Sequence, residues 1–94
     1  MNDWHFTGEI FFIKPHEGEF AVSLRVRGTS SRVDAMSTQI CEISCLGQEP
    51  VFRKMREDGI DVYTQAALTG HIETWTDRKG NSKIMLIVDA VSKV

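Results

Sequence analysis

An aromatic side chain and several cations stand close together around a glycine near the end of the chain. The segment ETWTDRKGNSKIMLIVDAV carries the indole of Trp75, followed by Arg78, Lys79 and Lys83 on either side of that glycine. An exposed indole can stack on an unpaired base, while ammonium and guanidinium groups bind phosphates. The combination is typical of a surface for single-stranded nucleic acid. The structural alternative is that Trp75 caps a hydrophobic core.

A second group of cations lies earlier in the chain, where Arg25, Arg27 and Arg32 occur in a stretch without acidic residues. Arg25 and Arg27 are two positions apart, so they share one face of a strand. We interpret the three arginines as phosphate-binding side chains. The alternative is a solvated strand face whose charges discourage aggregation, and Asp34 and Glu42 are close enough in sequence to neutralise them.

No arrangement of residues in the sequence predicts catalysis. His5, His16 and His71 are scattered, and no phosphate-binding GxxxxGK segment is present. Cys41 and Cys45 are four residues apart and do not form a CxxC pair, so we expect small buried thiols rather than zinc ligands. We therefore expect a protein that is not an enzyme and holds neither a cofactor nor a metal.

The composition predicts one globular domain over residues 1–94. Apolar residues make up 41% of the chain and charged residues 26%, which is ordinary for a globular protein. The net charge of −2 means that an anionic partner must be held by a local basic patch. No apolar run approaches the ~18 residues of a membrane span. We expect a cytoplasmic protein without a membrane partner, and free thiols suit that compartment.

Alternating apolar and polar residues predict five β-strands and one helix. The alternation is clearest in FAVSLRVRG, where every second residue is apolar. The helix has Pro50 in its first turn and Gly59 after its last, and its charged residues are interpreted as a solvated face. The expected strands cover residues 5–14, 20–28, 38–47, 65–75 and 83–94, and the helix covers residues 48–58.

The order of these elements is three strands, a helix and a hairpin. It predicts an all-β fold, namely a five-stranded Greek-key barrel of the OB type with one short helix between the third and fourth strands. The adjacent residues Phe11 and Phe12 are expected on opposite faces of the first strand, one in the core and one outside. Trp4 is expected in the core or in a subunit interface.

Three segments resemble a known family when they are taken in order. QAALTGHIETWTDRKGNSKIMLIVDAV, AVSLRV and ISCLGQ are similar to the last hairpin, the second strand and the third strand of bacterial and phage single-stranded DNA-binding proteins, to which the primosomal replication protein N is related. WTDRKG is the most specific piece. The resemblance implies an OB fold, homo-oligomers and sequence-tolerant binding of single strands, with Trp75 as a stacking residue. A phage- or plasmid-encoded member fits it equally.

The third strand departs from the family pattern and keeps a second function open. Ile40, Glu42 and Leu46 stand where family members often carry a tryptophan, a basic residue and a phenylalanine. The alternative function is a replication-associated protein–protein interaction module on the same barrel, with weak or incidental DNA binding. Ile40, Leu46 and either Phe11 or Phe12 would then dock a replication protein.

The main hypothesis is sequence-independent binding of single-stranded DNA, which coats or protects exposed strands during replication, recombination or repair. The expected partners are single-stranded DNA, replication proteins and further copies of the chain, in a homodimer or homotetramer that joins several patches. Trp75 stacks on a base in this hypothesis. The expected phosphate contacts come from Arg25, Arg27, Arg32, Arg78, Lys79 and Lys83.

Overall fold

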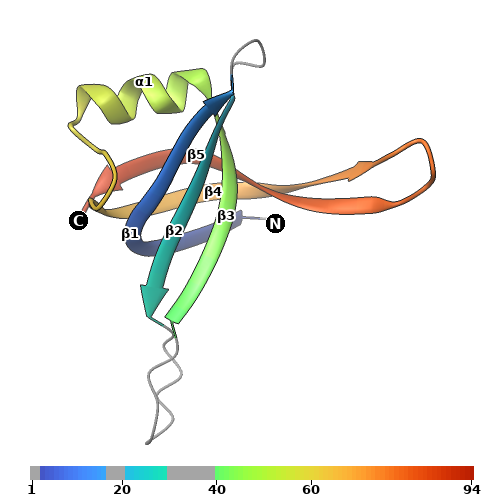
Figure 1. Ribbon diagram of the computed structural model, residues 1–94, viewed down its shortest axis with the longest axis horizontal. Helices are drawn as coiled ribbons and strands as arrows, with labels where there is room; N and C mark the ends of the chain where they lie inside the picture. Colours follow the sequence, from blue (N-terminus) through green and yellow to red (C-terminus); the bar gives the residue numbers. More distant parts are fainter. Residues whose placement is uncertain (1–2, 17–20, 30–39) are drawn as a thin grey trace, which may run out of the picture.

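The computed structural model describes residues 3–16, 21–29 and 40–94 of the chain. These residues form five strands and one helix, whose arrangement is shown in Figure 1. In chain order these are β1 (Asp3–His16), β2 (Ala21–Thr29), β3 (Ile40–Gln48), α1 (Glu49–Glu57), β4 (Gln65–Thr76) and β5 (Ser82–Lys93). Most residues between the first and second expected strands, and between the second and third, lie outside the described residues, as do Phe20, Arg32 and Asp34.

The five strands form a closed barrel in the order β1-β2-β3-β5-β4. All neighbours are antiparallel except β3 and β5, which run parallel. In the described part of the chain, these two strands pair only at Leu46 with Ile87 and at Gly47 with Val88. β4 then pairs with the first half of β1 and closes the barrel. The predicted five-stranded barrel of the OB type, with its helix between β3 and β4, is confirmed.

The core fills the barrel with the inward residues of every strand. β2 shows the predicted alternation, since Val22, Leu24 and Val26 are buried and both arginines between and after them are exposed. Cys45 of β3 also points inward, and burial raises the pKa of its thiol to about 12. The buried core cluster among the described residues consists of Ile10, Val22, Leu24, Val26, Cys45, Met55, Ile60, Ala66, Leu68, Val88 and Val91.

Helix α1 covers one end of the barrel (Figure 1). A proline stands at its start as predicted, and Met55 is buried with Val51 and Phe52 packed beside it. The charged residues face solvent: Arg53 forms a two-pronged ion pair with Glu49 four residues earlier. The helix therefore contributes an apolar stripe to the core, and the charges on its outer face pair with each other.

The first strand differs from the prediction in two respects. It continues through Pro15 to His16, where β1 pairs with β2 alone among the described strands. A strand edge of this kind tolerates proline. A β-bulge lies between Ile10 and Phe12, so the extra residue Phe11 interrupts the alternation. The expectation that one of Phe11 and Phe12 enters the core was wrong: both are half-buried and neither belongs to the core.

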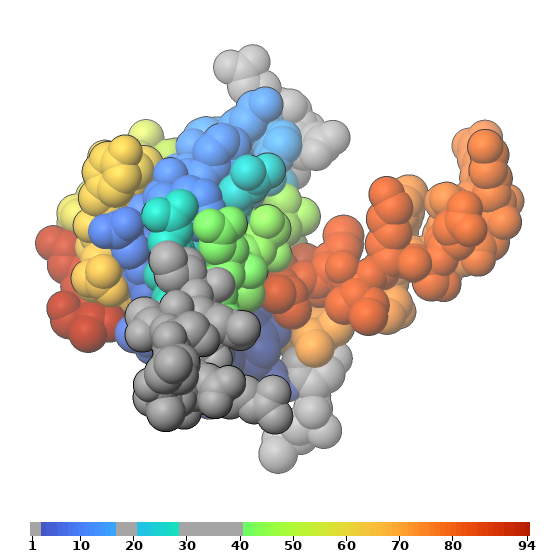
Figure 2. All heavy atoms as spheres, turned by 60° about the horizontal axis from the view of Figure 1, so that its bottom comes forward, coloured from blue at the N-terminus to red at the C-terminus, as the bar shows by residue number. Residues whose placement is uncertain are grey.

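The hairpin of β4 and β5 extends beyond the barrel as a projecting arm (Figures 1 and 2). We use "arm" for residues 72–76 of β4, 82–86 of β5 and the turn 77–81 between them. Within the described residues, β1 pairs with β4 only as far as His71, and β3 pairs with β5 only at Ile87 and Val88. The arm strands thus pair only with each other in that part of the chain.

Candidate nucleic-acid interface

The arm has two faces of different chemistry. Residues directly opposite each other on antiparallel strands share a face, and Trp75 lies opposite Lys83 while Glu73 lies opposite Met85. We call this side, which consists of His71, Glu73, Trp75, Lys83, Met85 and Ile87, the indole face. Trp75 is 53% exposed there. The accessible indole expected from the sequence is present, and the cation of Lys83 is its cross-strand neighbour.

The turn at the tip of the arm is held by Asp77. Its Oδ1 atom accepts hydrogen bonds from the backbone N–H groups of Lys79 and Asn81, each at 2.9 Å. These bonds, that from Asn81 foremost, lower the pKa of the Asp77 carboxyl. Gly80 has φ +85°, which favours glycine. The turn presents Arg78 and Lys79 to solvent, as the sequence predicted.

The outer face of β1 and β2 carries two arginines that lie on phenylalanine rings. The guanidinium carbon of Arg25 is 5.0 Å from the ring centre of Phe12, and that of Arg27 is 4.6 Å from the ring centre of Phe11. We call these four residues the arginine face. These distances are within the range of cation–π contacts, and both arginines stay exposed. The sequence analysis considered one of the two phenylalanines for docking, but the contact of both rings with arginines was not predicted, because a bulge cannot be read from local alternation.

The two arginines differ in their electrostatic balance. Arg27 lies 3.4 Å from a carboxylate oxygen of Glu42 on β3, in agreement with the neutralisation considered from the sequence. Arg25 lies opposite Ser44 instead and forms no ion pair with the described residues. Arg25 is therefore the freer of the two cations on this face.

A groove lies between the indole face and the end of the outer β2–β3 surface that carries the arginine face. On the barrel side, the groove is bordered by Ala21, Leu46 and Gln48, which share the outer face of β2 and β3 with the arginines. On the arm side, it is bordered by Glu73 and Met85. The groove has a volume of about 530 Å³ and opens to solvent. Its lining residues are Ala21, Leu46, Gly47, Gln48, Pro50, Glu73, Met85 and Ile87. One chain laid over the protein could thus touch the arginines, the groove and the indole in turn.

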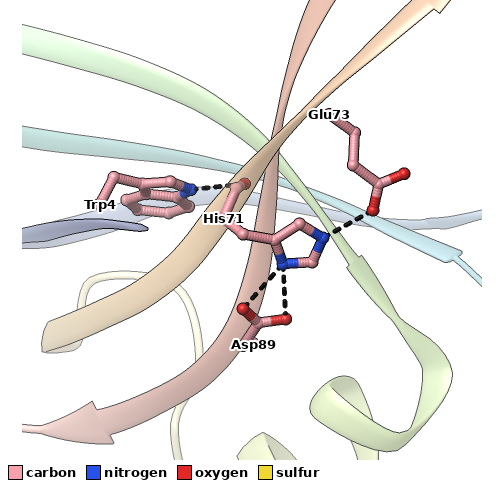
Figure 3. A network of polar contacts seen from close by, with 4 residues as sticks. All are labelled: Trp4, His71, Glu73 and Asp89. Carbon is pink, nitrogen blue, oxygen red and sulfur yellow. Dashed lines mark hydrogen bonds and ion pairs between the residues drawn. The ribbon is translucent and has the colours of Figure 1, made fainter. Parts of the chain in front are cut away.

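A histidine between two carboxylates lies where the arm leaves the barrel (Figure 3). Nδ1 of His71 is 2.8 Å from Oδ2 of Asp89, and Nε2 is 2.6 Å from Oε2 of Glu73. The hydrogen bonds to Asp89 first and to Glu73 second raise the pKa of His71. The imidazole thereby fixes the Glu73 side chain at the edge of the groove. From the sequence, His71 was expected to be one of three scattered histidines. The only local sign of its ion pairs is Glu73 two residues later, on the same face of the strand.

Trp4 has a structural role in this region. It packs against the core, and its Nε1–H donates a hydrogen bond to the backbone oxygen of His71 at 2.9 Å. The expectation of a core or interface position, rather than a base-stacking one, agrees with this placement.

The predicted binding residues therefore fall into three places. Trp75 and Lys83 lie together on the arm, Arg78 and Lys79 at its tip, and Arg25 and Arg27 on the barrel.

Within the described ranges, no group of three or more His, Cys, Asp or Glu residues is arranged to hold a metal ion. None of the described helices is both long and apolar enough to cross a membrane.

Comparison with known proteins identifies the fold. No protein-family model and no curated protein matches the sequence. Among solved structures, a small single-stranded DNA binding protein from Mycoplasma pneumoniae superposes with a TM-score of 0.70 at 10% identity, over 99% of this chain and 93% of that one. A mitochondrial single-stranded DNA binding protein from S. cerevisiae gives 0.71 at 6% identity, over 99% and 94%.

A third solved structure is the dimeric N-terminal domain of PriB from Thermoanaerobacter tencongensis, with a TM-score of 0.61 at 17% identity over 99% of this chain and 96% of that domain. At such identities the similarity shows a common fold. The chain thus has, over its full length, the OB fold of single-stranded DNA-binding proteins and of PriB, as the resemblance in its sequence implied.

Proposed function

We propose that this barrel, which shares the fold of single-stranded DNA-binding proteins, binds single-stranded DNA largely independently of sequence and catalyses no reaction. The observation that carries the proposal is the exposed indole of Trp75 with Lys83 directly opposite it. A single strand needs flat surfaces for its bases and cations for its phosphates, and the arm offers both side by side.

The path of the strand follows from the continuity of the surface. It runs from Arg25 and Arg27 on the barrel, across the groove, to Trp75 and the cations of the arm. Phosphates contact Arg25, Arg27, Arg78, Lys79 and Lys83 in this proposal, and Arg32 belongs to the same set from outside the described residues. The biological setting is the coating of exposed strands in replication, recombination or repair, in the cytoplasm.

The second face of the arm supports an oligomer. Thr74 and Ile84 lie opposite each other there, and Ile84 is 75% exposed. A two-stranded ribbon is marginally stable by itself, and an exposed large apolar side chain favours burial against a partner. We propose that a second copy of the chain covers this face in a homodimer or homotetramer. The joined surfaces then bind one strand more tightly than either alone.

A protein–protein interaction module remains the second candidate. Ile84 also supports this function, as does Tyr63, which is 75% exposed in the α1–β4 connection. The residues first considered for docking support it less, since Leu46 lines the groove and Phe11 and Phe12 lie against arginines. The side chain of Ile40 lies outside the described residues.

Titration of labelled oligonucleotides separates the two functions. Fluorescence anisotropy with oligo-dT of about 15 nucleotides, a length near the upper range of one OB fold, should show saturable binding. A duplex of the same length is the control and should bind much more weakly, because its bases are stacked inside the helix and offer no face to Trp75. The proposal is contradicted if the protein binds the single strand and the duplex with equal affinity, or if it binds neither of them.

A further inference from the structure

A carboxylate stands in the middle of the surface assigned above to single-stranded DNA. Glu73 is two residues from Trp75 on the indole face and lines the groove, together with Ala21, Leu46 and Gln48 of the barrel. A negative charge at this point repels phosphates, so it lowers the affinity of a protein that only follows the backbone. On this surface, Glu73 is therefore better suited to contact a base than a phosphate.

The groove offers both apolar and polar surface and is large enough to admit one base. Leu46, Met85 and Ile87 supply apolar surface, and Glu73 and Gln48 add polar side chains. Its volume of about 530 Å³ lies within the range of small-molecule sites. A base that turns away from its neighbours in a single strand can enter such a groove and present its Watson–Crick edge.

Glu73 is held in a fixed orientation that leaves acceptor capacity free. His71 binds its Oε2 atom at 2.6 Å, while Asp89 binds the opposite nitrogen of the same imidazole. Within the described part of the chain, Oε1 of Glu73 receives no hydrogen bond, and the side chain is 54% exposed. An ionised carboxylate only accepts hydrogen bonds, so Glu73 selects for groups that donate.

Among the four bases, guanine has two donors side by side on its Watson–Crick edge, N1–H and the N2 amino group. Thymine has one N–H between two carbonyl oxygens, and a carboxylate repels both oxygens. Adenine and cytosine each have an acceptor nitrogen beside their amino group, so they offer a carboxylate only one donor beside a repulsive atom. We propose that the groove between barrel and arm is a base subsite that prefers guanine, with the Glu73 carboxylate accepting from N1–H and N2–H. This inference rests on the proposed function and adds one selective subsite to an otherwise tolerant surface.

The preference is measured with short strands of about 8 nucleotides, within the range that one OB fold covers. Oligo-dT is compared with the same strand carrying one central dG and with one carrying deoxyinosine, which lacks the N2 amino group. The dG strand should bind about tenfold more tightly than oligo-dT, the scale of one two-pronged contact to a base. The inosine strand should lie between them.

Two variants assign the effect to the groove. Glu73→Gln keeps the shape but replaces one acceptor by a donor, so it should bind oligo-dT at least as well as the unmodified protein and lose the preference for dG. Glu42→Gln is the matched control, because it removes a carboxylate from β3 at the arginine face, away from the groove, and it should keep the ratio between the strands.

The outcomes distinguish this inference from the function on which it rests. Equal binding of the dG and dT strands overturns the guanine subsite and leaves single-strand binding intact. A preference that persists in Glu73→Gln overturns the role of Glu73. Failure to bind any strand overturns the proposed function itself.

Discussion

Trp4 and Gly70 lie opposite each other across the β1–β4 pairing, and the indole of Trp4 fills the space that a side chain at residue 70 would need. A Cβ atom at this glycine would lie 2.8 Å from the indole and 1.8 Å from the backbone oxygen of Ile87. Because backbone blocks one side and a large ring the other, only glycine fits where β4 leaves the barrel for the arm.

Gly70→Ala should therefore destabilise the protein. Forcing an extra carbon into a packed site costs about 1–3 kcal/mol, and each kcal/mol lowers the Tm of a domain of this size by roughly 4–8 °C. Gly47→Ala is the matched control, since its Cβ would lie 3.5 Å from Val51, an ordinary contact. Thermal unfolding followed by circular dichroism measures both, and equal Tm values for Gly70→Ala and the unmodified protein would contradict the steric argument.

Trp75→Ala should weaken single-strand binding by roughly tenfold or more, because one stacked base contributes about 1–3 kcal/mol. Trp75→Phe keeps an aromatic face and should retain much of the affinity. Thr69→Ala, at an exposed position of β4 outside the arm, should leave binding unchanged. Anisotropy titrations with labelled oligo-dT provide the affinities. If Trp75→Ala binds like the unmodified protein, the indole does not stack on DNA.

Binding should weaken as salt rises, with a log–log slope of about −0.7 for each phosphate neutralised. Arg25→Ala should make this slope shallower by about 0.7, since Arg25 is exposed and has no acidic partner among the described residues. Arg53→Ala is the control, because Arg53 is an exposed helix residue already paired with Glu49. If the slope becomes shallower by the same amount in both variants, the change reflects net charge rather than a phosphate contact made by Arg25.

The stability contributed by His71 should depend on pH. Its pKa is raised above 6.5 by Asp89 and Glu73, so the folded protein binds the proton more tightly than the unfolded chain. The contribution is complete below pH 6.5 and is lost as pH rises through the elevated pKa. His71→Gln should remove this part of the dependence. Tm measurements from pH 5.5 to 8.5 compare the two proteins, and parallel curves would argue against the ion pairs.

The turn at the tip should loosen when Asp77 is replaced by alanine. The backbone N–H groups of Lys79 and Asn81 then lose their acceptor, and their hydrogen exchange should become faster. Asp77→Asn keeps an oxygen acceptor and should protect them better. The Tm should change little, because the turn lies away from the barrel core. Slow exchange of both amides in Asp77→Ala would mean that the turn does not depend on this side chain.

The barrel was predictable because its signals are local. The strands begin and end within a few residues of the expected positions, as period-two alternation specifies which residues point inward. The helix likewise follows from a proline at its start and from the stripe containing Met55. The failure at Phe11 and Phe12 has the same origin: a bulge adds a residue without a signature in composition, and it turned both rings toward arginines of β2.

By itself, the sequence determined the order of the strands, the position of the helix and an aromatic residue beside a cationic turn, since each depends on neighbours a few residues apart. The tertiary structure alone decided that Ala21 and Leu46 share a groove with Glu73 and Met85. The reason is closure of the barrel: the short parallel pairing of β3 with β5 at Leu46 and Gly47 brings together residues far apart in the chain. Local patterns in the sequence do not predict this contact between distant segments.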